Sequence, residues 1–378
     1  MSEGVATEPV QRALARIDTG AIERHCARLA GELSGDARLC AVVKADGYGH
    51  GAVESARAAL AGGAAWLAVA AAAEAAELRE AFPEPRILTM GALTPAELDV
   101  ALQARSDVAV WRAEFLELVM ERAEALGEPV RIHLKYDSGM GRLGDPYPEA
   151  VAALVNAAAA DPRLEAAGLW THFATADERE SDYFDVQMRR FVEMARPLKR
   201  KHPEMLLHAA NSAATLRDPA SHFDMVRCGV AIYGLDPFQG DPEGSRLEPA
   251  LELHSYVADV KRFEQGASAG YGQRWTAPQD TWVGVLPIGY GDGVRRGLSN
   301  NADVIVGGRR YPLVGTVSMD NITIDLGPEP DVEPGAGAVL IGAQNGERIL
   351  AEEMAGRLAT INYEVTCGIS GRVPRSYA

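Results

Sequence analysis

Eight short apolar segments alternate with helical patterns through the first two thirds of the chain, and this alternation constrains the fold more than any other feature. Each segment has the length of a buried strand, and 39–43 is an unbroken apolar run with β-branched members. Alanine-rich stretches such as 71–81 and 148–160, bounded by glycine or proline, predict helices between them. Strands that alternate with helices form a parallel sheet. The expected strands are 39–43, 66–70, 86–90, 107–111, 131–137, 168–173, 206–211 and 226–233.

Eight strand and helix units within roughly 230 residues are typical of a closed (β/α)8 TIM-type barrel. An open, doubly wound sheet is the alternative, but no GxGxxG motif opens a helix after the first of these strands. We therefore expect an α/β fold with a barrel over residues 19–245.

The pattern changes after the acidic stretch 236–248, whose glycines and prolines predict a linker. The apolar segments that follow are strand-like and are joined by turns instead of helices. They are 251–257, 283–288, 302–306 and 321–326. A mostly β C-terminal domain is therefore expected over residues 249–378. The alternating segment 12–18 precedes the first expected helix, 21–33, and can join that β domain as a strand.

Composition and charge exclude several classes of protein. The chain has 378 residues, of which 47% are hydrophobic, enough for two domains with cores. A net charge of -16 argues against nucleic acid or an anionic membrane as a partner. Neither a signal peptide pattern nor an apolar run of about 18 residues is found, so we expect a cytoplasmic protein. The four cysteines are scattered without a CxxC pair, so no metal site is expected.

Lys44 directly follows the first expected strand of the barrel, and Gly47, Gly49 and Gly51 predict a turn there. In a parallel barrel the carboxyl ends of the strands form the active face. An amine at that face suits covalent chemistry on a carbonyl group. A lysine that reaches into solvent is the commoner case, so Lys44 alone does not identify a site.

Four later strand ends also carry polar residues. They are 135–142, 171–173, 208–212 and 227–229. One histidine or arginine at a strand end is usually structural, but several on one face are typical of an active site. Asn211 and Ser212, at an expected helix start, and Gly229 predict a phosphate site, although Ser212 can instead cap its own helix. A reactive lysine, a phosphate site and a nearby histidine together indicate pyridoxal phosphate.

Seven stretches form an ordered set along the chain. They are AVVKADGYGHG (41–51), DSGMGRLG (137–144), THFATADE (171–178), ANSAA (210–214), RCGVAIYG (227–234), VSMD (317–320) and INYEV (361–365). The set spans nearly the whole chain and resembles the alanine racemase family, fold type III pyridoxal-phosphate enzymes. The resemblance implies a (β/α)8 barrel, a C-terminal β domain, pyridoxal 5'-phosphate as cofactor and a homodimer with shared active sites. It also implies interconversion of L-alanine and D-alanine, which supplies D-alanine for bacterial peptidoglycan.

The resemblance implies two catalytic bases. Lys44 binds the cofactor and serves the D-isomer, and Tyr271 of the partner subunit serves the L-isomer. A phenol has a pKa near 10, so it needs a positive neighbour to act as a base at neutral pH. Arg142 is the expected neighbour and also touches the substrate carboxylate. Arg227 faces the pyridine nitrogen, to which a guanidinium cannot give a proton, and His172 lies against the ring.

Further site residues follow from the same resemblance. The residues expected to bind the cofactor beside Lys44, His172 and Arg227 are Tyr48, Asn211, Ser212, Gly229 and Tyr363. Met319 and Asp320 of the partner subunit border the substrate carboxylate. Lys135 matches a position that is carbamylated in some members, where the added charge steadies Arg142. Ser318 departs from the cysteine that many members have before the Met-Asp pair.

Three other functions remain as alternatives. A decarboxylase of the same architecture places a carboxylate, where this chain has Arg227, at the ring nitrogen. A non-enzymatic cofactor-binding protein needs Lys44 and the phosphate motifs, but it does not need Tyr271, Met319 or Asp320. A broader amino-acid racemase is the nearest competitor. Because such enzymes tend to be exported and this chain shows no export signal, alanine is the favoured substrate.

Overall fold

The computed structural model describes residues 11–378, which form two compact units. The first unit is Gly20–Leu247, and the second joins residues 11–19 to Glu248–Ala378. Among these described residues, none of the helices combines the length and the apolar character that crossing a bilayer requires.

The first unit is a closed barrel of eight parallel strands in the order β2 to β9. The ring closes because β2 pairs with β9 as well as with β3. The strands are β2 (Arg38–Val42), β3 (Trp66–Val69), β4 (Arg86–Thr89), β5 (Asp107–Val110), β6 (Val130–Lys135), β7 (Leu164–Trp170), β8 (Leu206–His208) and β9 (Met225–Cys228). The (β/α)8 barrel predicted from the alternating pattern is confirmed.

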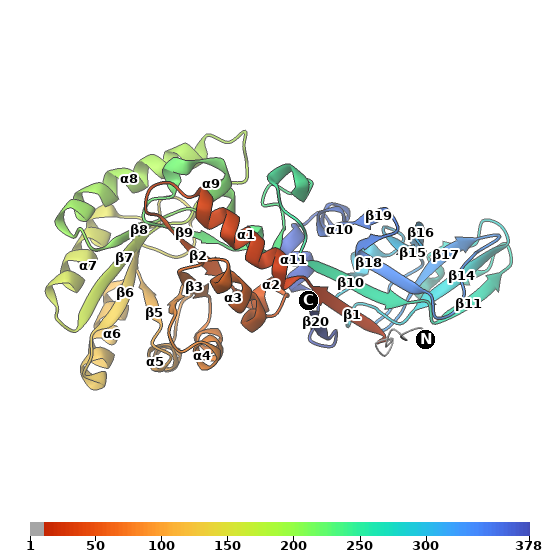
Figure 1. Cartoon of the computed structure of the whole chain (residues 1–378), viewed down its shortest axis with the longest axis horizontal. Coiled ribbons are helices and arrows are strands. Elements are labelled where there is room, and N and C mark those ends of the chain that lie inside the picture. The colour runs from red at the N-terminus through yellow and green to blue at the C-terminus, as the bar shows by residue number, and fades with distance from the viewer. Residues whose placement is uncertain (1–10) are drawn as a thin grey trace, which may run out of the picture. The chain divides into compact units, whose positions relative to one another are not determined.

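Helices connect the barrel strands and cover their outer face (Figure 1). They are α1 (Thr19–Glu32), α2 (Lys44–Tyr48), α3 (Ala52–Ala61), α4 (Ala72–Ala81), α5 (Pro95–Gln103), α6 (Ala113–Leu126), α7 (Pro148–Ala160), α8 (Tyr183–Lys201) and α9 (Ser212–Arg217). Many begin with a recognisable start signal. In α5, for example, the Thr94 side chain accepts a hydrogen bond from the Glu97 amide, and Pro95 occupies the first turn.

The last apolar segment of the barrel was predicted too long as a strand. The expected strand 226–233 ends at Cys228, and Val230–Tyr233 forms a short 3-10 helix, η2. The Ser212 hydroxyl accepts hydrogen bonds from the amides of Gly229 and Ala231, which turns the backbone out of the ladder. Because both the strand and η2 are buried, the apolar run continues across the boundary and hides it.

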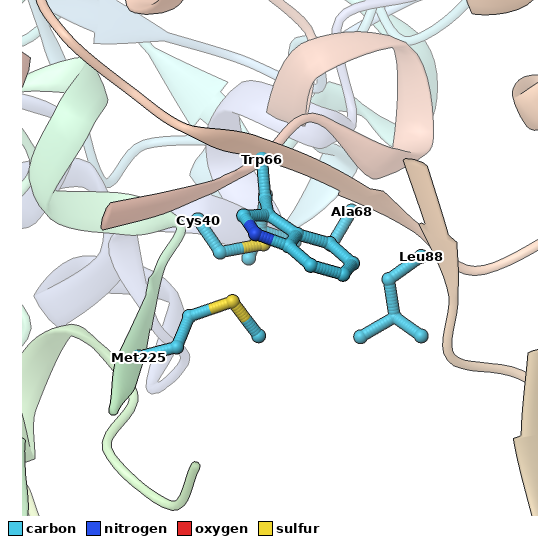
Figure 2. Close-up of a cluster of buried hydrophobic side chains, with 6 residues drawn as sticks. Cys40, Trp66, Ala68, Leu88 and Met225 are labelled. Atoms are coloured by element: carbon cyan, nitrogen blue, oxygen red, sulfur yellow. The ribbon is translucent and has the colours of Figure 1, made fainter. Parts of the chain in front are cut away.

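The barrel interior is filled by side chains from neighbouring strands. Figure 2 shows the Trp66 indole in the middle of one such cluster, beside Cys40, Leu88 and Met225. Trp66 is 1% exposed and is among the largest fully buried side chains of the described chain. The barrel is therefore a packed core, as is usual for this architecture.

The second unit is mostly β, as predicted. Its main sheet has the order β11-β14-β17-β16-β15-β18-β10-β1-β20, with β19 beside β18, and β12 pairs with β13 separately. The strands are β1 (Ala13–Ile17), β10 (Leu251–Tyr256), β11 (Asp259–Phe263), β12 (Ser268–Ala269), β13 (Trp275–Thr276), β14 (Thr281–Leu286), β15 (Asp303–Val306), β16 (Arg309–Val314), β17 (Ile322–Gly327), β18 (Gly337–Gln344), β19 (Glu347–Ile349) and β20 (Arg375–Tyr377). Two helices, α10 (Ala351–Leu358) and α11 (Asn362–Cys367), complete it.

Strand β1 belongs to this second sheet although it starts the described chain. It pairs antiparallel with β10 and parallel with β20, so segments far apart in sequence form one ladder. Several strands lay outside the sequence prediction. Strand β11, with the sequence DVKRF, sits at the sheet edge and has no buried residue, so no apolar run marks it.

Replacing Trp66 by alanine is expected to destabilise the barrel by about 3–5 kcal/mol, because a large cavity is left in a closed core. The free energy of unfolding, measured by urea titration, tests this. Leu126→Ala, at a side chain that is 44% exposed, is the matched control and should change it by no more than about 0.5 kcal/mol. Equal losses in both variants contradict the assignment of Trp66 to the core.

Candidate active site

Lys44 begins a turn with left-handed backbone conformation at the carboxyl end of β2. Ala45, Asp46 and Gly47 have φ of 54°, 52° and 58°, and Tyr48 follows with φ of 54°. The sequence predicted a turn here from its glycines, but three of these four residues carry side chains. A left-handed conformation costs such residues about 1–2 kcal/mol each, so this turn stores strain.

Hydrogen bonds hold the strained turn in place. The Gly47 amide donates to the carbonyl of Val43 over 2.9 Å, and the Ala45 amide donates to Glu74 Oε1 over 2.6 Å. The Asp46 carboxylate accepts from the amide of Ala52, at the start of α3, over 2.9 Å. Lys44 is thereby fixed at the mouth of the barrel, and its Nζ lies 5.9 Å from the centre of the Tyr48 ring.

Several cationic side chains face one another at this mouth. Burial, followed by the positive charges of Arg227, Arg142 and Lys44, lowers the pKa of Lys135 from 10.5 to about 7, and only Asp137 opposes the shift. Burial lowers the pKa of Arg227 to about 10. The structure therefore brings together four predicted site residues of like charge: Lys44, Lys135, Arg142 and Arg227.

His172 sits among these cations and is neutral. Burial, and then the charge of Arg227, hold its pKa well below 6.5. The Nη2 group of Arg227 donates to His172 Nδ1 over 3.2 Å, and to the carbonyls of Thr171 and Ala209 over 2.9 and 3.1 Å. Arg227 is thus a buried, donor-only group with fixed partners. It cannot act as a proton acid.

Arg142 is carried by the loop after β6. The Asp137 carboxylate accepts hydrogen bonds from the amides of Gly139, Met140 and Gly141 over 2.6–2.9 Å, which folds the loop back on itself. The Arg142 side chain is exposed at the end of this folded segment. It is therefore available to an anionic ligand.

A cluster of small and polar residues lies at the start of α9 and η2. Ser212, at the start of α9, is buried and accepts from the amides of Gly229 and Ala231 over 3.0 and 3.3 Å. A Cβ at Gly229 would lie 2.5 Å from the Tyr48 hydroxyl, so only glycine leaves room there. The predicted phosphate residues Tyr48, Ser212 and Gly229 are thus close together. Asn211 uses its side-chain oxygen to cap α9 at the amide of Ala214 over 3.0 Å.

This donor set fits a ligand that carries both a phosphate and a carbonyl group. The hydroxyl groups and the small residue Gly229, which lets a ligand come close to the backbone, suit a phosphate. The start of α9 adds a favourable dipole. An excess of buried positive charge beside them is stabilised only when anions enter. An amine whose neighbours are cationic is easier to deprotonate, which suits covalent bonding to a carbonyl.

Sequence reasoning missed Trp170 at the end of β7. Lys135 Nζ lies 4.0 Å, and the Arg227 guanidinium carbon 4.8 Å, from the centre of the indole. The ring therefore offers its negative face to both cations and partly offsets their repulsion. The only sequence signal was an aromatic residue immediately before the Thr-His pair.

The remaining predicted site residues lie in the β unit. Tyr271 begins the short 3-10 helix η4 (Tyr271–Gln273), and its side chain is 72% exposed. Met319 is 51% exposed, and Asp320 forms an ion pair of 2.6 Å with Arg372. Tyr363 is half-buried on α11.

Comparison with known families gives one result for both units. Residues 17–237 match the family model described as "Alanine racemase, N-terminal domain", and residues 250–377 match "Alanine racemase, C-terminal domain". The chain is 40% identical to alanine racemase 1 of Bacillus subtilis, over 99% of this chain and 95% of that protein. It is 43% identical to alanine racemase of Geobacillus stearothermophilus, over 96% and 92% of the two chains.

Solved structures agree with the sequence matches. Alanine racemase from Streptomyces coelicolor superposes with a TM-score of 0.92 at 39% identity, over 97% of this chain and 98% of that one. The Bacillus anthracis alanine racemase with bound L-Ala-P gives a TM-score of 0.88 at 37% identity, over 98% and 96%.

The depressed pKa of Lys135 should appear as a pH-dependent stability. Between about pH 7 and 10.5 the unfolded chain holds a proton on Lys135 that the folded chain lacks, so stability should rise with pH in this window. Lys135→Met, which has no such proton, should lack this rise. Urea unfolding at pH 7 and pH 10 in bicarbonate-free buffer measures the difference.

The exposed Lys261→Met variant serves as the control for loss of a lysine. It should follow the wild type at both pH values. A stability difference between wild type and Lys135→Met that stays constant from pH 7 to pH 10 contradicts the depressed pKa.

Proposed function

Because this chain belongs to the alanine racemase family and is an isomerase that interconverts L-alanine and D-alanine, we propose that it works with pyridoxal phosphate and two bases. The observation that carries the proposal is the cluster of four cationic side chains at the barrel mouth, next to the cradle formed by Tyr48, Ser212 and Gly229. A cofactor with a dianionic phosphate and a substrate with a carboxylate together supply the negative charge that this mouth lacks.

Pyridoxal phosphate bound there supplies an electron sink that stabilises negative charge on the substrate α-carbon. Lys44 would hold it covalently through Nζ. Tyr48, Asn211, Ser212 and Gly229 would hold the phosphate, with Tyr363 of the β unit as a further ligand. His172 would lie against the ring. The neutral state of His172 supports this placement, because an uncharged imidazole packs against a ring without adding a fifth positive charge.

Arg227 would keep the ring nitrogen unprotonated. Its guanidinium donates through Nη2 to two carbonyls and to His172, and with a pKa of about 10 it keeps its protons at neutral pH. The bound cofactor would then withdraw electrons less strongly, and the substrate α-carbon would be reprotonated quickly. This favours racemisation over transamination.

Two residues would move the proton on opposite faces of the substrate. Lys44 Nζ would take the α-hydrogen from D-alanine and return one to it. The hydroxyl of Tyr271 of the partner subunit would do the same for L-alanine, with Arg142 nearby to favour the phenolate and to bind the substrate carboxylate. The position of Lys44 at the barrel mouth, with Nζ 5.9 Å from the centre of the Tyr48 ring, supports the first role.

Lys135 would be carbamylated, which would add a negative charge beside Arg142 and orient it. A pKa of about 7 supports this, since only a neutral amine reacts with carbon dioxide. Met319 and Asp320 of the partner subunit would border the substrate carboxylate. The exposed side chains of Tyr271 and Met319 support a homodimer with shared sites. The D-alanine produced would enter peptidoglycan synthesis.

Lys44→Ala is expected to abolish both the colour and the reaction. Purified wild-type protein should be yellow and convert L-alanine to D-alanine, whereas the variant has neither an amine to hold the cofactor nor the base for D-alanine. Visible absorbance and chiral analysis of the product measure the two effects. Lys261→Ala should behave like the wild type, and a colourless, inert wild type contradicts the proposal.

Tyr271→Phe is expected to lose proton transfer on the L-alanine side and to keep the cofactor. Racemisation should fall by about 10²–10⁴-fold, the usual contribution of one acid–base group. In deuterated water the variant should still exchange the α-hydrogen of D-alanine but not that of L-alanine. Proton NMR of the two isomers measures this. Equal loss of both exchanges, or loss of the yellow colour, counts against the assignment.

The shared site can be tested by mixing the two variants. Coexpressed Lys44→Ala and Tyr271→Phe chains should form mixed dimers in which one of the two sites has both bases. Activity should therefore reappear although each parent is inactive. A mixture that stays inactive, with mixed dimers shown by mass spectrometry, contradicts a site shared between chains.

A further inference from the structure

A row of buried polar side chains runs from Arg227 into the barrel core, and the roles proposed above make no use of it. Arg227 Nη1 lies 2.9 Å from His208 Nδ1, and His208 Nε2 lies 2.8 Å from His133 Nδ1. His133 Nε2 lies 3.2 Å from Asp107 Oδ2. All four side chains are almost fully buried. We call this row the core relay.

The chemistry of its two ends fixes every proton in the core relay. A guanidinium can only donate and a carboxylate can only accept. Since Arg227 donates to His208 Nδ1, His208 must carry its hydrogen on Nε2 and donate to His133 Nδ1. His133 must then carry its hydrogen on Nε2 and donate to Asp107.

No other placement of the ring hydrogens satisfies all three hydrogen bonds of the core relay. A hydrogen on Nδ1 of either imidazole would bring two donors face to face at one of the short contacts. Burial, and then the charge of Arg227, hold the pKa of His208 well below 6.5, which agrees with a neutral ring. Both histidines are thus neutral and of one tautomer, a state that an isolated imidazole does not hold by itself.

The surrounding structure is shaped to hold these two rings. The Trp170 indole lies parallel to the His208 ring, with centroids 5.7 Å apart, and the Trp66 indole meets His133 edge-on at 5.5 Å. The pairing of β6 with β7 shifts register between Ile132 and His133, which sets Gly168 opposite His133. A Cβ at Gly168 would lie 2.2 Å from His133 Nδ1. The irregularity and the glycine therefore make the space for the ring.

The core relay ends at the opposite end of the barrel from the active face. Asp107 is the first residue of β5, and its Oδ2 also accepts from Arg131 Nε over 3.2 Å. None of the ion pairs within residues 11–378 involves Arg227, so no described carboxylate pairs with that buried charge directly. Asp107 is the acidic group that His133 and His208 link to Arg227 by hydrogen bonds.

We propose that Asp107 and His133 are positioning residues for the reaction, which act on Arg227 through His208. Asp107 sets the tautomer of His133, which sets that of His208, so that Nδ1 of His208 always offers a lone pair to Arg227. This holds one arm of the guanidinium and leaves the other directed at His172 and the site. The inference rests on the proposed role of Arg227 toward the cofactor ring.

The tautomers can be measured without any reaction. In full-length protein labelled with ¹⁵N-histidine, NMR spectra should show both His133 and His208 neutral with hydrogen on Nε2, whether or not pyridoxal phosphate is added. Assignment comes from the signals lost in His133→Asn and His208→Asn. A hydrogen on Nδ1 of either ring, or a cationic ring, overturns the proposal. This measurement is independent of racemase activity, so its failure is distinct from failure of the proposed function.

Two substitutions at Asp107 separate positioning from general stability. In Asp107→Asn the amide oxygen should remain the acceptor, because Arg131 also donates to it. The histidine tautomers should then be unchanged, and turnover should stay within about twofold of the wild type. In Asp107→Ala the acceptor is lost, and kcat per cofactor-loaded site should fall about tenfold at unchanged KM. The wild-type NMR measurement still decides the question if Asp107→Ala does not fold.

Thr89→Val is the matched control. Thr89 is buried, and its hydroxyl bonds to that of Ser106, next to Asp107, over 2.7 Å but takes no part in the core relay. It should lose stability without a change in kcat or in the histidine tautomers. The proposal is overturned if Asp107→Ala behaves like Thr89→Val, or if Asp107→Asn loses as much turnover as Asp107→Ala.

Discussion

A cluster of positive charge at one end of a closed barrel is the constraint on which the rest of this protein depends. Lys135 feels three other cations and only one opposing carboxylate, Asp137. Lys135 and Arg227 are buried, and burying like charges close together costs free energy that packing, hydrogen bonds and the Trp170 ring must offset. Such a mouth is stable only because the barrel is rigid and well filled, and it favours the binding of anions. The proposed cofactor and substrate both bring negative charge, so binding relieves the same repulsion that folding creates.

The barrel places these charges by geometry, because all parallel strands end on one face. Lys44 follows β2, Lys135 ends β6 and Arg227 lies within β9, with the neutral His172 after β7. Backbone strain refines the position of the first of them. The left-handed residues after Lys44 are held by hydrogen bonds from α3 and α4, so the cost of the turn is met by the scaffold around it.

Arg227 connects the two proposals about mechanism. Toward the site it is a cation that keeps its protons at neutral pH, and in the proposed mechanism this leaves the cofactor a weak electron sink. Toward the core it is the donor that begins the core relay to Asp107. Its buried charge is thus steadied by hydrogen bonds and by the Trp170 ring, and it has no direct ion pair within the described chain. Because the core relay would position Arg227 from inside the barrel, the open mouth stays free for ligands.

The sequence by itself determined the barrel, the β domain and the motifs at the strand ends, because periodic apolar runs and turn residues are local signals. It did not determine the boundary at Cys228, where a buried 3-10 helix continues the apolar run of the strand, or the edge strand β11, which has no apolar run. The left-handed turn after Lys44, the cation–π role of Trp170 and the core relay came only from the tertiary structure. Each depends on contacts between residues that are distant in sequence, such as Asp107 with His133 and His208 with Arg227, and no local pattern records which side chains a closed barrel brings face to face.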